Sequence, residues 1–117
     1  MNYFSEDEFK CKCGCGLDLT TKAKDSFIKA RELSGTPYNI TSGARCLKHN
    51  KAVGSKSNSA HIDGLACDIS FSGSGQKFKI IRGLILAGFK RIGINDNYSF
   101  IHADLSKALP NEIMFKY

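Results

Sequence analysis

The chain has no tryptophan and no apolar run long enough to cross a membrane. Its longest apolar stretch, "IIRGLILAG", is interrupted by Arg82 and falls far short of the ~20 residues that a membrane helix needs, so we expect no membrane insertion. The acidic N-terminal segment "MNYFSEDEFK" lacks the apolar core of a signal peptide, which predicts synthesis in the cytoplasm. Action outside the cell would then require release or another export route.

Repeats, linkers and nucleic-acid-binding motifs are also missing. Without a linker or a repeat, the 117 residues predict one domain, 1–117, with one ordinary hydrophobic core. The net charge of +6 is carried by scattered lysines, and it is compatible with an anionic cell wall, nucleic acid or simple solubility. With no recognisable nucleic-acid motif and no tryptophan, we do not expect nucleic-acid binding. We expect the protein to be a monomer.

Five cysteines are present, three of them in "CKCGCG". Cys11, Cys13 and Cys15 are spaced C-x-C-x-C, tighter than the paired C-x2-C of structural zinc sites, and no partner pair follows. An odd count without a signal peptide argues against a secreted disulfide framework. We interpret the three as buried or free thiols in an N-terminal hairpin, with an accessory metal or redox role as the alternative. Cys46 and Cys67 stand alone, and the spacing disfavours a cysteine-rich nucleic-acid module.

Periodicity and capping signals predict a small α+β domain with an antiparallel sheet. The expected elements are a helical turn at 4–9, helices over 20–34 and 76–87, and strands at 38–42, 65–71, 90–94 and 99–105. Apolar stripes are expected at Ala23, Phe27, Ala30 and Leu33 of the first helix, and at Phe78, Ile81, Leu84 and Ile85 of the second. A long polar loop, 43–61, precedes the second strand.

Two of these strands alternate between apolar and polar residues. In "LACDISF", Asp68 falls on the face opposite to the apolar residues, between small neighbours that leave room for a ligand. In "SFIHADL", His102 and Asp104 share one face in the same way. His61, seven residues before Asp68, adds a second imidazole.

Two histidines and one aspartate suit a catalytic zinc site. They give tetrahedral Zn²⁺ three protein ligands and leave a fourth position for water. Zinc lowers the pKa of that water to about 7, and Asp104 is placed beside His102 to take its proton. Taken singly, each residue is more often a structural polar group, but their matching strand faces favour a shared metal centre.

The stretch "ITSGARCLKHNKAVGSKSNSAHIDGLACDI", followed by "SFIHADL", closely resembles the zinc D-Ala-D-Ala carboxypeptidases. These peptidoglycan peptidases belong to a wider group with the lysostaphin-type enzymes and the hedgehog signalling domain. The shared pattern is S-G-x-R, H-N-K-A-V-G, S-x-H-x-x-G-x-A-x-D and H-x-D, and the N-terminal "FSEDEFKCKCGCG" resembles the family too. The resemblance implies that His61, Asp68 and His102 bind one catalytic zinc ion. It also implies that Arg45 binds the substrate and stabilises the developing oxyanion.

The resemblance leaves the general base open between two aspartates. Several members of the wider group carry a glutamate three residues before the last zinc histidine, and that position is Ser99 here. Asp104 fits the motif of the small members and is our first candidate. Asp96, six residues before His102, is the runner-up, in a loop that could fold over the site. Ser59 is expected to take part in substrate binding.

The implied fold is a compact α+β domain with a central antiparallel sheet, helices packed on one side and zinc on the open face. The implied substrate is the stem peptide of peptidoglycan, cut at terminal D-Ala-D-Ala or at an internal bond such as L-Ala-D-Glu. The short single-domain chain resembles phage or prophage lysis proteins and their bacterial relatives, which implies action on the bacterial wall after release or export by another route. The alternative is a non-catalytic, hedgehog-like zinc domain for partner binding, against which Arg45 and an acidic candidate base argue.

Overall fold

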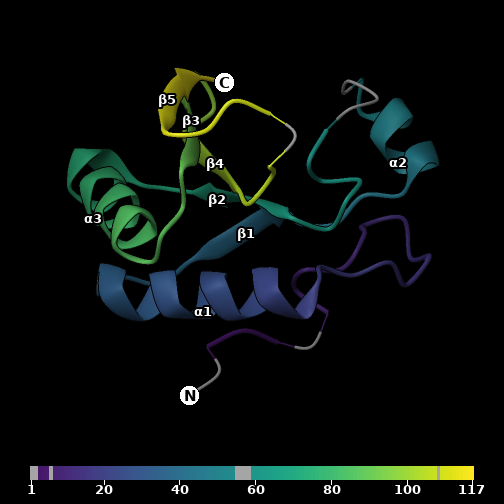
Figure 1. Ribbon diagram of the computed structural model, residues 1–117, viewed down its shortest axis with the longest axis horizontal. Coiled ribbons are helices and arrows are strands. Elements are labelled where there is room, and N and C mark those ends of the chain that lie inside the picture. Colours follow the sequence, from purple (N-terminus) through teal and green to yellow (C-terminus); the bar gives the residue numbers. More distant parts are fainter. Residues whose placement is uncertain (1–2, 6, 55–58, 108) are drawn as a thin grey trace.

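Figure 1 shows the computed structural model of the protein, which describes residues 3–5, 7–54, 59–107 and 109–117. Within these residues, helices lie beside one five-stranded sheet. The helices are α1 (Thr21–Ser34), α2 (Leu47–Ala52) and α3 (Gly73–Leu86). The strands are β1 (Asn39–Ser42), β2 (Ala66–Ser70), β3 (Arg91–Asn95), β4 (Phe100–Asp104) and β5 (Ile113–Lys116). The α+β class expected from the sequence is confirmed.

The sheet has the strand order β1-β2-β4-β3-β5 and is mixed. The pairs β1–β2, β2–β4 and β3–β4 are antiparallel, as predicted, whereas β5 adds to the edge of the sheet parallel to β3. Strand β5 was not predicted from the sequence, because it is short and mostly exposed and so lacks a strong apolar alternation. In the β2–β4 pair, Asp68 lies directly opposite His102.

Helix α1 begins one residue after its predicted start and ends at the predicted residue, Ser34. The Thr20 side chain accepts a hydrogen bond from the backbone of the first turn, and Gly35 ends the helix in the left-handed conformation with φ 68°. The prediction that Leu33 is buried is wrong, since Leu33 is 40% exposed. Ser34 is buried instead, where its hydroxyl lies 2.6 Å from the Tyr38 hydroxyl. The buried residues of the helix are Ala23, Phe27, Ala30 and Ser34.

Helix α3 begins earlier than predicted and buries a different face. It starts at Gly73, three residues before the predicted start at residue 76. Of the predicted stripe, Phe78 and Ile85 are 64% and 52% exposed, and only Leu84 is fully buried. The buried residues are Ile80, Gly83 and Leu84. Gly83 explains why α3 buries a different face from the predicted one. A Cβ atom at this position would lie 2.6 Å from the Ala30 carbonyl oxygen, so the glycine allows α1 and α3 to pack closely.

Helices α1 and α3 cover one face of the sheet (Figure 1). The core under them includes residues of β2 and β4 that are 0% exposed, namely Cys67, Ile69, Ile101 and Ala103. Asp68, His102 and Asp104 alternate with these residues and therefore face the other side of the sheet. The alternation read from the sequence thus separates the core face from the polar face correctly.

The connection from β1 to β2 was predicted as a loop but contains α2. Cys46 precedes this helix, and its sulfur accepts a hydrogen bond from the His49 N–H (3.4 Å). Residues 55–58 of the connection lie outside the described residues. Near the N-terminus, residues 7–9 form a turn rather than a helix, with the Ser5 N–H donating to the Glu8 carboxylate (3.1 Å) as in half of a capping box. No helix in the described part of the chain has the length and apolar character to span a membrane.

Candidate metal centre

The structure brings His61, Asp68 and His102 together on the polar face of the sheet. One ligand atom from each residue lies within 4.8 Å of the others. Asp68 Oδ1 is 3.3 Å from His61 Nε2 and 3.0 Å from His102 Nδ1. All three residues are buried, and they come from the turn before β2, from β2 and from β4. The three residues chosen from the sequence as ligands therefore lie together, and their binding of zinc stays a prediction.

A backbone carbonyl determines which nitrogen His61 presents to this centre. His61 Nδ1 lies 2.7 Å from the Gly43 carbonyl oxygen, and because a carbonyl only accepts, Nδ1 carries the proton. The lone pair of neutral His61 is then on Nε2, which is buried and has no hydrogen-bond partner among the described residues. A lone pair and a carboxylate oxygen that lie this close in a buried place repel each other unless a cation or a proton lies between them.

His102 is oriented in a matching way by a second carboxylate. Its Nε2 donates to Asp104 Oδ2 over 2.6 Å, which leaves Nδ1 facing Asp68. Such a carboxylate–histidine pair orients an imidazole for metal binding. Tetrahedral zinc with ligands about 2.0–2.1 Å away would place neighbouring ligand atoms about 3.3–3.4 Å apart. The two separations from Asp68 Oδ1, 3.3 and 3.0 Å, are close to this, so the group fits a zinc ion.

The carboxylates and imidazoles of the centre shift one another's pKa values toward the charged forms. Burial alone would raise the pKa of Asp68, but the hydrogen bond with His102 and the nearby His61 ring lower it to about 2. Burial alone would lower the pKa of His102, but the carboxylates of Asp104 and Asp68 raise it above its ordinary value. The contact between Asp68 and His102 therefore favours positive charge beside the Asp68 carboxylate, as a metal site requires.

Asp104 lies on the predicted face, but its contacts were not predicted. It is 1% exposed, its Oδ2 accepts from His102, and its Oδ1 accepts from Arg91 Nε (3.0 Å) and the Ser106 N–H (3.0 Å). Burial alone would raise its pKa, but these partners, His102 first, lower it. Both carboxylate oxygens are thus engaged, which gives Asp104 a role in orienting His102. Its assignment as the general base stays a prediction.

Asp96 is not brought into the buried group. It follows β3 in the turn to β4, its side chain is 69% exposed, and it accepts a hydrogen bond from Lys77 Nζ (2.7 Å). Together with Lys77 it lines a hollow of about 500 Å³ whose lining does not include the three candidate ligands. Its position therefore gives the runner-up base no support.

Arg45 and Ser59 both lie beside the three candidate ligands. Arg45 is 7% exposed, and its backbone N–H donates to the His61 carbonyl oxygen (2.9 Å). The Ser59 hydroxyl accepts from the His61 N–H (3.2 Å) and lines a groove of about 520 Å³ together with His102 and Asp104. The groove therefore reaches the candidate centre at His102.

Tyr117, which was not predicted as a site residue, forms a wall of this groove. Its ring stacks on the His102 imidazole, with centroids 4.3 Å apart and an interplanar angle of 20°. Burial, followed by the charge of Asp68, raises the pKa of Tyr117 to about 12, while the guanidinium of Arg45 opposes this shift. The aromatic residues two apart in "FKY" were the available signal, because Phe115 and Tyr117 share a strand face and both lie near His102.

Two histidines and a carboxylate that meet in one buried group, beside a groove lined by His102, are the ligand set typical of hydrolytic zinc sites. The sequence profile of the family Peptidase M15 matches residues 2–104. The match covers most of the chain, and the protein belongs to this family of zinc-dependent peptidases. No curated protein sequence matches the chain.

Proposed function

We propose that the protein is a zinc peptidase that hydrolyses a peptide bond in the stem peptides of peptidoglycan. The observation that carries the proposal is the convergence of His61 Nε2, His102 Nδ1 and the Asp68 carboxylate in one buried group beside a groove. Membership of the M15 peptidases supports hydrolysis of a peptide bond. The net charge of +6 favours an anionic substrate such as a bacterial wall. The bond would be the terminal D-Ala-D-Ala or an internal one such as L-Ala-D-Glu.

Each residue near the centre has a distinct role in this proposal. Zinc held by the three ligands would lower the pKa of a coordinated water and polarise the substrate carbonyl. Arg45, a permanent cation close to Tyr117 and His61, would bind the carbonyl or carboxylate oxygen of the substrate and stabilise negative charge as it develops. Ser59 would line the path of the peptide.

We assign Asp104 first to the positioning of His102. A carboxylate that fixes the proton on Nε2 also fixes the lone pair on Nδ1, and so sets the ring in its metal-binding orientation. Arg91 in turn holds Asp104 in place. The sequence-based proposal that Asp104 also accepts the proton of the attacking water remains, and the two roles differ in their effect on zinc affinity.

Digestion of purified peptidoglycan tests the proposed function. The zinc-loaded protein is incubated with sacculi, and the soluble products are identified by mass spectrometry. We expect fragments with new ends inside or at the end of the stem peptide, and we expect none from His61→Ala. If the folded, zinc-loaded protein binds sacculi without releasing such fragments, the non-catalytic interaction domain is the correct interpretation.

A further inference from the structure

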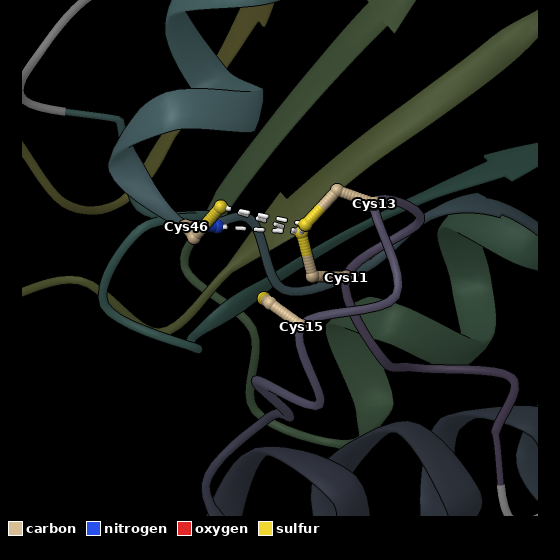
Figure 2. A group of neighbouring side chains, drawn as sticks. All are labelled: Cys11, Cys13, Cys15 and Cys46. Carbon is tan, nitrogen blue, oxygen red and sulfur yellow. Dashed lines mark hydrogen bonds between the residues drawn. The ribbon is translucent and has the colours of Figure 1, made fainter.

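A second group of metal-ligating side chains lies outside this centre. The structure brings Cys46, which precedes α2, next to Cys11, Cys13 and Cys15 of the N-terminal segment (Figure 2). The four sulfur atoms all lie within 4.8 Å of one another, and none is in a disulfide. Cys67, the fifth cysteine, lies in the hydrophobic core and takes no part.

The spacing of the sulfur atoms is that of ligands around one ion. The Sγ–Sγ distances are 3.4 Å for Cys11–Cys13, 3.6 Å for Cys13–Cys46 and 3.9 Å for Cys11–Cys46. Four thiolates at about 2.3 Å from a tetrahedral zinc ion lie about 3.8 Å from one another. A disulfide, by contrast, requires about 2.05 Å. We propose that Cys11, Cys13, Cys15 and Cys46 bind one structural Zn²⁺ ion.

The backbone explains how a C-x-C-x-C segment reaches a single point. On an extended strand, alternate residues are about 6.7 Å apart, so three such cysteines could not share one ion. Here Gly14 and Gly16 adopt φ of 85° and 88°, which turns the segment back on itself. The Cys11 N–H donates to the Leu17 carbonyl oxygen (2.8 Å) and closes the loop. The spacing alone favours thiols in a hairpin over an accessory metal role, because it does not reveal that Cys46 lies beside the other three.

Two backbone amides favour the thiolate form of this group. The Cys46 N–H points at Cys11 Sγ, and the His49 N–H points at Cys46 Sγ, each over 3.4 Å. Amide donors of this kind stabilise negative charge on sulfur, which a metal site with four thiolates requires.

The ion would link the N-terminal segment to the part of the chain that supports the first centre. Cys46 directly follows Arg45, and the Ala44 N–H donates to the Phe9 carbonyl oxygen (2.9 Å). Gly43, one residue earlier, holds the His61 imidazole. A structural zinc ion would therefore fix the segment from Gly43 to Cys46, while lying outside the groove and taking no part in hydrolysis.

The test separates the two centres by mutation. The double variant His61→Ala/His102→Ala removes the first centre, and its zinc content is measured by plasma mass spectrometry after purification under reducing conditions. We expect it to keep about one zinc ion per chain, bound through sulfur ligands alone at about 2.3 Å by X-ray absorption. Adding Cys13→Ser should abolish this zinc, whereas adding Cys67→Ala, the matched control, should leave it.

Replacement of zinc by cobalt provides a readout that does not depend on a folded cysteine variant. The double variant loaded with Co²⁺ should show the strong thiolate-to-metal absorption of a four-sulfur tetrahedral site. The proposal is overturned if the double variant holds no zinc, if nitrogen or oxygen ligands appear, or if iron is the ion found. A mass lower by two hydrogens under non-reducing conditions, with no metal bound, would instead assign the group to a disulfide. The double variant lacks the first centre, so neither result depends on the proposed peptidase activity.

Discussion

The single carbonyl of Gly43 determines the chemistry that His61 can perform. By accepting from Nδ1, it directs the lone pair of Nε2 toward Asp68, and it does so from a residue 18 positions away in the chain. Sequence patterns predicted that His61 is a ligand, but they could not predict its tautomer, because that depends on a tertiary contact. The same holds for Arg91, whose contact with Asp104 joins two strands across the sheet.

Arg45 provides a direct test of substrate binding at this centre. Arg45→Ala should leave the zinc content unchanged, because the guanidinium is not among the ligands. It should lower kcat/KM by on the order of a hundredfold or more, the usual effect of removing one oxyanion donor. Metal analysis and peptide hydrolysis measured on the same preparation check both parts. Activity near that of the wild type would mean that Arg45 has only a structural role.

Asp104→Asn distinguishes the two roles proposed for this carboxylate. If Asp104 positions His102, the variant should bind zinc roughly 10- to 100-fold more weakly, as is typical when such a partner of a ligand is lost. If it is the general base alone, zinc affinity should be normal while kcat falls by about a hundredfold or more. Competition with a chromophoric chelator measures the affinity, and hydrolysis at saturating zinc measures kcat.

Asp96→Asn is the matched control for this experiment. Its carboxylate is exposed and paired with Lys77, so both quantities should stay close to those of the wild type. A large fall in kcat for Asp96→Asn with little effect for Asp104→Asn would place the base in the β3–β4 turn.

Among the elements, α3 shows where sequence periodicity fails. A stripe of large apolar residues predicted the buried face, but the close contact with α1 requires the smallest side chain, Gly83, at the interface. A hydrophobic pattern cannot reveal this, because glycine contributes nothing to it. The strands were predicted better, since a period of two leaves only two faces, and the alternation around Asp68 and His102 assigned both correctly.

Gly83→Ala should destabilise the protein by about 1–3 kcal/mol, the usual cost of overpacking. The added methyl group would meet the Ala30 carbonyl oxygen, which is part of the α1 backbone and cannot move aside alone. Gly75→Ala in the same helix is the control, because a Cβ atom there meets no atom within 4 Å. It should be neutral or stabilise by up to about 1 kcal/mol. Urea denaturation followed by circular dichroism measures both; equal effects would contradict the proposed helix contact.

The stability of the whole molecule should depend on pH in opposite ways with and without zinc. The pKa of Asp68 is lowered, so its contribution to the metal-free protein is complete above pH 3.8 and is lost as the pH falls toward about 2. The pKa of His102 is raised, so its contribution is complete below pH 6.5 and is lost as the pH rises through the raised value. The Tm of the metal-free protein should therefore be highest between about pH 4 and 6.5.

Above about pH 6, zinc should reverse the dependence of the Tm on pH. The ion binds the deprotonated imidazole, so its stabilising effect grows as protons leave His102. Between about pH 6 and 8, the Tm of the zinc-loaded protein should rise while that of the chelated protein falls. Thermal denaturation of both forms across this range checks the prediction, and parallel curves would show that His102 does not bind the metal.

The central claim is that zinc held by His61, Asp68 and His102 makes this M15 family member a peptidase. The most direct measurement is peptide hydrolysis in peptidoglycan by the protein after chelation and again after zinc is restored, with His61→Ala treated in parallel. We predict that chelation abolishes the release of stem-peptide fragments, that zinc restores it in the wild type, and that zinc does not restore it in the variant. Hydrolysis by the fully metal-free protein, or equal activity of His61→Ala, would contradict the claim.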